Sequence, residues 1–249
     1  MWLYDLLDRL ILPRMAAVIL VSHSMREELE TIMRQAQKLH VVPNGMDIQE
    51  VQDSSEQPIS SDLQGFLSAH SPVVLGVGRL AAEKGFDALI ESVSQLTESY
   101  PDIGLIIVGE GKLREQLQAL AEERGIANKV MMPGFYDQIP ALMRQSDVLA
   151  MPSKTEGLPM TALEAMAVGI PIVATRVGAL PAVLEQGEGG WFVDSNSSKS
   201  VATSLKDCLE DPEKTGSKIR WAKEKVVQSF SAEAMEKAYR DIYQKVFAA

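Results

Sequence analysis

The fold is decided by the stretch VVLGVGRLAAEKGFDALIESVSQLTESYPDIGLIIVG, residues 73–109. It begins and ends with short runs rich in Val, Ile and Leu, VVLGVG at 73–78 and IGLIIVG at 103–109. Between these runs the apolar residues recur at helical spacing, at Phe86, Leu89, Ile90, Val93 and Leu96. The order strand, helix, strand predicts two parallel strands joined by a crossover helix.

The same alternation continues toward the C-terminus. Four more apolar runs follow: KVMMPG at 129–134, DVLAMP at 147–152, PIVAT at 171–175 and GWFVD at 190–194. The pattern predicts an α/β fold, a Rossmann-like parallel sheet of about six strands with helices on both faces. Residues from 201 onward have a helical pattern, with Ser231 as the expected N-cap of a C-terminal helix.

The first seventy residues have a different pattern. An apolar strand at 16–22 has too few neighbours to fill a buried parallel sheet, and the polar stretch 47–62 is typical of a surface loop. We therefore expect residues 1–40 to be the remnant of another domain. The expected parts are a helix–strand–helix remnant (1–40), an interdomain linker (41–71), a Rossmann-like domain (72–230) and a C-terminal helix (231–249).

Composition limits the function classes. The net charge of −10 opposes a bulk attraction to nucleic acid or anionic lipid, so any bound phosphate must be held by local groups. Cys208 is the single cysteine, which excludes an intrachain disulfide and favours the cytosol. Residues 1–15 form an amphipathic pattern with two acidic residues on its polar face, so packing against protein is favoured over a membrane surface.

The segment PSKTEGLPMTALEAMAVGIPIVAT, residues 152–175, carries the strongest functional pattern. A strand ends, a loop brings Glu156, and a helix is expected to begin with Pro159 at its first position. The free amides of such a helix start are an anion site, so a diphosphate would dock at 158–161. Glu156 and Glu164 would flank it, one at a sugar and one at a ribose. Alternatively, each glutamate is a solvated charge near a helix start.

Two cations follow the first strand of the predicted sheet. Arg79 and Lys84 are five positions apart across one turn, so both can face the cleft at the strand ends and neutralise a diphosphate without a metal ion. The competing interpretation is an exposed pair of Glu83 with Lys84 and a loop salt bridge for Arg79. The three histidines and Cys208 show no metal-ligand spacing, so we expect no metal site.

Together these stretches resemble the retaining glycosyltransferases of family 4, also called group 1, which have two Rossmann-like domains (the GT-B fold). Four linked stretches, within about 16–193, carry the resemblance: VVPNGMD (41–47), GRLAAEKGF (78–86), LIIVGEGKLREQL (105–117) and EGLPMTALEA (156–165). The chain departs from the family at Gly178-Ala179 and Pro181-Ala182, where Gly-Gly and Pro-Glu pairs are common.

The resemblance implies a role for each matching residue. Arg79 and Lys84 would contact the donor diphosphate and Glu156 the transferred sugar, and these three are the implied catalytic residues. Glu164 would bind the ribose hydroxyls. The other implied donor-binding residues are Gly78 and Gly109 at strand ends, Met132, Pro133, Gly134 and Phe135 beside the nucleobase, and Gly157, Leu158, Pro159, Met160 and Thr161 at the phosphate.

The expected function is transfer of a hexose from a nucleoside-diphosphate sugar to an acceptor hydroxyl with retention, without metal or other cofactor. With most of the N-terminal domain missing, the chain by itself would bind nucleotide but transfer poorly. Expected partners are the nucleotide sugar, an acceptor glycan or lipid-linked sugar, and the missing domain or a second chain, with self-association as a further outcome. A non-catalytic module that pairs with another chain is the alternative; an epimerase is weaker. We expect the cytoplasm, at the inner membrane face if the acceptor requires it.

Overall fold

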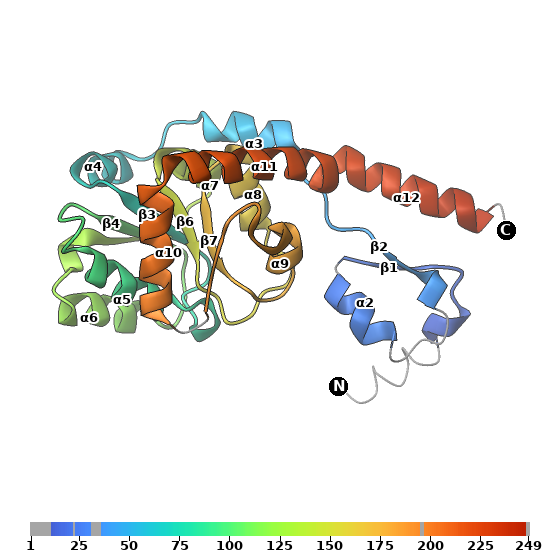
Figure 1. Ribbon diagram of the computed structural model, residues 1–249, viewed down its shortest axis with the longest axis horizontal. Coiled ribbons are helices and arrows are strands. Elements are labelled where there is room, and N and C mark those ends of the chain that lie inside the picture. Colours follow the sequence, from blue (N-terminus) through green and yellow to red (C-terminus); the bar gives the residue numbers. More distant parts are fainter. Residues whose placement is uncertain (1–10, 22, 31–35, 195–196, 248–249) are drawn as a thin grey trace. The chain divides into compact units, whose positions relative to one another are not determined.

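The computed structural model describes residues 11–21, 23–30, 36–194 and 197–247 of the chain (Figure 1). It divides into two compact units. The smaller unit comprises Met1–Asp47 and Val227–Ala249, and the larger unit comprises Ile48–Val226. Within the described residues, no helix combines the length and the apolar character that crossing a membrane requires.

The larger unit is built on one parallel sheet whose strand order is β5-β4-β3-β6-β7-β8. All five neighbouring pairs are parallel. The strands are β3 (Val73–Val77), β4 (Gly104–Val108), β5 (Val130–Gly134), β6 (Val148–Met151), β7 (Ile172–Thr175) and β8 (Trp191–Val193). Each lies inside one of the six apolar runs, so the predicted fold class is confirmed.

Two groups of helices cover the sheet, and the helices of each group pack against one another. One group contains α5 (Phe86–Leu96), α6 (Arg114–Glu123) and α10 (Ser198–Glu210), and the other contains α3 (Ile48–Ser55), α7 (Ile139–Gln145) and α8 (Met160–Val168). Strands β3, β4, β6 and β7 are apolar on both faces and almost fully buried, as a doubly covered parallel sheet requires, whereas the outermost strand β5 is only partly buried. The remaining helices of this unit are α4 (Ser61–Ala69), α9 (Leu180–Val183) and most of α11 (Pro212–Phe230).

The strand order reverses direction between β3 and β6. From β3 the chain runs outward through β4 to β5, and from β6 it runs outward the other way through β7 to β8. At such a switch point the loops leaving the two central strands diverge, and a crevice opens at their carboxyl ends. The order therefore places the segments after Val77 and after Met151 beside each other.

The expected surface loop at 47–62 was wrong, because α3 occupies Ile48–Ser55. Ile48, Val51 and Ser55 lie on one face of the helix, and α3 packs against α7 and α8. A hydrogen bond of 2.8 Å from Gln49 Nε2 to Asp53 Oδ1 adds support one turn apart on the exposed face. Two apolar residues among polar ones are enough for a helix when a neighbouring surface covers them.

The smaller unit contains the strand expected within 16–22 and a second strand that pairs with it. β1 (Val18–Leu20) and β2 (Leu39–Val41) pair in parallel, with α2 (His23–Glu30) between them in the chain. Leu20 and Leu39 form its small buried cluster. The N-terminal amphipathic pattern at 1–15 falls largely on residues 1–10, outside the described part of the chain.

The same unit contains the C-terminal helix α12 (Ala232–Phe247). The Ser231 hydroxyl accepts a hydrogen bond of 3.1 Å from the backbone N–H of Ala234, so Ser231 is the N-cap, as predicted. Two backbone bonds of 2.9 Å flank this cap, from Met46 N–H to Phe230 and from Ala232 N–H to Met46. They fix the start of α12 against the segment that follows β2.

Candidate functional site

The segment after β3 is shaped by two glycines. A Cβ at Gly78 would lie 3.1 Å from Cε of Lys84, so the alkyl stem of Lys84 passes directly over Gly78. Gly85 has φ +67°, in the left-handed region that favours glycine, and a Cβ there would lie 2.2 Å from the carbonyl oxygen of Pro152. The segments that leave β3 and β6 are therefore in direct contact, and Lys84 points along that contact.

Lys84 and Glu156 form an ion pair across this contact. Lys84 Nζ lies 2.6 Å from Glu156 Oε1, with exposed side-chain fractions of 19% and 9%. The Ser153 hydroxyl donates a second hydrogen bond of 2.7 Å to the same oxygen. A largely buried carboxylate is stable here because a cation and a hydroxyl both compensate its charge.

The backbone on either side of Glu156 is held by neighbouring segments. A Cβ at Gly178, where φ is +57°, would lie 1.9 Å from the carbonyl oxygen of Glu156. The backbone N–H of Ala179 donates a hydrogen bond of 3.0 Å to the carbonyl of Gly157. On the other side, the buried Thr175 hydroxyl donates 2.5 Å to the carbonyl of Ser153. The turn that carries the carboxylate is therefore fixed to the end of β7 and to the loop after it.

Helix α8 begins beside this turn, one residue later than predicted. Its first residue is Met160, and Pro159 occupies the N-cap with extended φ and ψ rather than the first helical position. Proline has no side-chain acceptor, so the amides of Met160 and Thr161 have no side-chain cap at that position. Apart from its two chain neighbours, no described heavy atom comes within 4 Å of a Cβ placed on Gly157, and Gly157 and Met160 are both exposed to solvent. An anion can approach these amides.

Arg79 lies beside the site but is engaged elsewhere. Its guanidinium Nη2 lies 2.8 Å from Glu83 Oε1, and its side chain is 78% exposed. The structure thus brings Lys84 and Glu156 together at the strand ends, where the sequence places both, and joins Arg79 to Glu83, as the competing loop salt bridge requires. The exposed Glu83–Lys84 pair of the competing interpretation is not the arrangement seen, since Lys84 is bonded to Glu156.

Glu164 lies one helical turn inside α8. Its carboxyl group is half-buried, and this burial raises the pKa of Glu164 above the ordinary glutamate value. A half-buried carboxylate favours ligands that donate hydrogen bonds, such as a pair of hydroxyl groups. The placement is compatible with the predicted ribose contact.

Leu158 lies in the turn before α8, and the other predicted residues lie in β5 or directly after β4 and β5. Gly109 N–H donates 2.8 Å to the carbonyl of Gly134, and a Cβ at Gly109 would lie 1.9 Å from the carbonyl oxygen of Gly78. The carboxyl ends of β3, β4 and β5 are therefore in direct contact through Gly78, Gly109 and Gly134. Phe135 follows with 81% of its surface exposed, whereas Met132 packs against the core and lines a cavity of about 310 Å³ beside α6. Half-buried Pro133 lies between them.

Sequence reasoning missed Ser153 and Thr175. Both stand in the segment quoted for its glutamates, but a serine after a proline has no pattern that distinguishes it from an ordinary loop residue. The spacing of three between Ser153 and Glu156 indicates a hydroxyl within reach of the carboxylate in a tight turn. The spacing between Ser153 and Glu156 is therefore the one sequence feature that could have indicated a role for Ser153.

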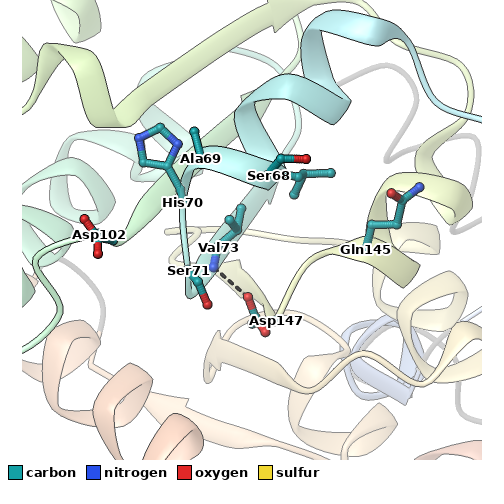
Figure 2. Close-up of a pocket in the computed structure, with 9 residues that line it drawn as sticks. Ser68, Ala69, His70, Ser71, Val73, Asp102, Gln145 and Asp147 are labelled. Carbon is teal, nitrogen blue, oxygen red and sulfur yellow. Dashed lines mark hydrogen bonds between the residues drawn. The ribbon is translucent and has the colours of Figure 1, made fainter.

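Another cavity, of about 450 Å³, lies at the opposite edge of the sheet, at the amino ends of β3 and β6 (Figure 2). There the Asp147 carboxylate accepts 2.7 Å from Val73 N–H, and the His70 ring stacks on Phe66. The predicted site residues do not line it. Within the described residues, no group of three or more His, Cys, Asp or Glu side chains is arranged to hold a metal ion.

Known proteins match this chain closely. A family model described as glycosyl transferases group 1 matches residues 64–225. The D-inositol 3-phosphate glycosyltransferase of Corynebacterium urealyticum is 31% identical over 84% of the chain and 51% of its own length. A putative colanic acid biosynthesis glycosyltransferase of Salmonella typhimurium is 32% identical over 70% of the chain and 45% of its own length. The chain thus spans about half of these relatives.

Solved structures match as well. Anabaena HepE, in crystal structures with UDP and with UDP-glucose, is 26% identical, with TM-scores of 0.79 and 0.77. The match covers 94% of this chain and 64% of HepE.

Proposed function

Because the chain belongs to the glycosyl transferases group 1, we propose that its larger unit binds the donor of a retaining, family 4 hexosyltransferase. The donor is a nucleoside-diphosphate sugar, and the complete reaction transfers its hexose to an acceptor hydroxyl. The observation that carries this proposal is the Lys84–Glu156 pair beside the open start of α8. HepE, which binds UDP-glucose, supports the donor class.

The diphosphate would lie between Lys84 and the amides of Met160 and Thr161. A cation and a helix start together neutralise the charge that builds on the leaving phosphate, which is where stabilisation lowers the barrier. Arg79 joins them if its guanidinium leaves Glu83, and its exposed side chain permits that movement. With these groups on the diphosphate, we propose that no metal ion is required.

Glu156 would accept hydrogen bonds from the transferred sugar and Glu164 from the ribose, while Gly134 and Phe135 face the nucleobase. The acceptor oxygen attacks the anomeric carbon on the face from which the diphosphate departs. The bond from that carbon to the phosphate oxygen breaks, the bond to the acceptor forms, and the leaving phosphate takes the acceptor proton. Configuration is therefore retained.

The acceptor would be a glycan or a lipid-linked sugar, as in cell-envelope polysaccharide synthesis, which the Salmonella relative's name supports. We place the protein in the cytoplasm, at the inner membrane face where the acceptor is lipid-linked. Expressed by itself, the 249-residue chain should bind nucleotide and transfer slowly. Rate enhancement depends on holding donor and acceptor together, and the larger unit supplies the residues that would bind the donor.

Calorimetry with UDP, GDP and ADP tests the proposal, each with and without EDTA. At least one nucleotide should bind, and EDTA should leave its affinity unchanged. Lys84→Ala should weaken binding by about 10- to 100-fold, the worth of a charge-assisted hydrogen bond. Lys206→Ala is the matched control, because Lys206 forms a surface pair with Glu210 on α10 and its loss should have no effect. Absence of binding by all three nucleotides at millimolar concentration contradicts the proposal.

A further inference from the structure

Both hydrogen bonds to the Glu156 carboxylate end on one of its two oxygens. Lys84 Nζ and the Ser153 hydroxyl lie 2.6 and 2.7 Å from Oε1. No hydrogen bond reaches Oε2 from the described residues. We propose that Ser153 is a positioning residue that holds Oε1, so that Oε2 faces the sugar of the donor. This inference rests on the proposed function.

Lys84 cannot hold Glu156 alone once a donor is bound. Its ammonium group is a compact charge with three donors on a flexible stem, and a diphosphate brings a stronger negative charge than a carboxylate. Lys84 therefore has to divide its hydrogen bonds between Glu156 and the phosphates. The Ser153 hydroxyl has no such competitor, because Ser153 is only 2% exposed.

The backbone of Ser153 is fixed on both sides. Its carbonyl accepts 2.5 Å from the hydroxyl of Thr175, which is fully buried at the end of β7. The next residue, Lys154, donates its N–H over 2.7 Å to the carbonyl of Glu83, in the segment after β3. Ser153 thus has little freedom to lose when a donor binds, which is the property of a preorganised positioning group.

The consequence for binding separates two parts of the donor. Without the Ser153 hydroxyl, the Glu156 carboxylate can rotate about its side chain, so its second oxygen no longer meets the sugar. The nucleotide part would contact Lys84 and the start of α8, whereas the Ser153 hydroxyl donates to Glu156. Loss of the hydroxyl should therefore lower the affinity for the nucleotide sugar and leave the affinity for the nucleotide unchanged.

The test compares UDP with UDP-glucose, and GDP with GDP-mannose, by calorimetry on the full chain. The quantity measured is the ratio of the two affinities within each pair. Ser153→Ala should reduce that ratio by about tenfold, the effect of one hydrogen bond to a charged group, with the UDP or GDP affinity within twofold of wild type. Ser92→Ala is the matched control: Ser92 is equally buried, and its hydroxyl donates to the carbonyl of Leu89, away from the site.

Thr175→Val provides a second variant if Ser153→Ala fails to fold. It removes the hydroxyl that donates to the Ser153 carbonyl and, over 3.4 Å, to the carbonyl of Met151, and it should reduce the same ratio by about two- to threefold. An unchanged ratio in the folded variants overturns the role of Ser153 and leaves the proposed function standing. An equal loss for nucleotide and nucleotide sugar also overturns it, because that result indicates a general structural effect. A wild-type chain that binds none of these four ligands, and no ADP either, contradicts the proposed function itself, and this inference with it.

Discussion

Replacing Lys84 with methionine should destabilise the folded chain as well as weaken nucleotide binding. Methionine keeps an apolar stem over Gly78, where Lys84 Cε would lie 3.1 Å from an added Cβ, and removes only the ammonium group. The Glu156 carboxylate, with 9% of its side chain exposed, then keeps the Ser153 hydroxyl as its one described donor. The substitution therefore isolates the charge of Lys84.

The magnitude follows from the burial of the pair. Removing one partner of a fully buried ion pair costs about 3–5 kcal/mol. Lys84 is 19% exposed and Ser153 still donates to the carboxylate, so water and the hydroxyl offset part of that cost. We expect a loss of about 1–3 kcal/mol in the free energy of unfolding, near the penalty for an unsatisfied polar group.

The double variant Lys84→Met/Glu156→Gln should recover most of that loss, because it removes both charges together. The measurement is urea unfolding at neutral pH, followed by tryptophan fluorescence and circular dichroism, for wild type, both single variants and the double variant. A Lys84→Met chain as stable as wild type would refute the reasoning. Additive losses in the double variant would also refute it, because they would show that the two side chains do not interact.

Two further predictions concern Glu164 and Cys208. Because the pKa of Glu164 is raised in the folded chain, ionisation of this carboxyl opposes folding at any pH above its unfolded-state pKa. Glu164→Gln should therefore be more stable than wild type at pH 7, and this gain in stability should vanish below about pH 4. The same variant should bind nucleotide about tenfold more weakly by calorimetry, and a loss of stability at pH 7 would contradict the burial argument. Burial raises the pKa of Cys208 to about 12, so iodoacetamide at about pH 8 should label Cys208 in urea but not in the folded chain. Labelling is measured by mass spectrometry, and rapid labelling of the folded chain would contradict the prediction.

The sheet could be predicted from sequence because each strand is a continuous apolar run bounded by glycine or proline. Helix α3 could not, because eight residues with Ile48 and Val51 as their apolar members give too short a pattern, and the surface that stabilises them comes from α7 and α8. The convergence of Lys84 on Glu156 was predictable, since both follow strands whose carboxyl ends share one edge of the sheet.

The partners of the site residues were harder to predict. Arg79 has Glu83 four positions later, and sequence alone gives no reason to choose that partner over a ligand. The role of Ser153 depends on a side-chain rotamer in a turn fixed by Thr175 and by the loop at Gly178. Such contacts arise from segments that are distant in sequence, so no local pattern encodes them.

In the proposed function, the strand order separates the residues beside the diphosphate from those beside the nucleobase. Lys84 and Glu156 follow β3 and β6, each of which has a neighbour on both sides, whereas Phe135 follows β5, which is an outermost strand. A change in length or composition after an outermost strand disturbs one adjacent strand, and the two central ones keep their register. In the proposed function, the segment beside the base can therefore vary among proteins of this topology while the proposed diphosphate site is kept.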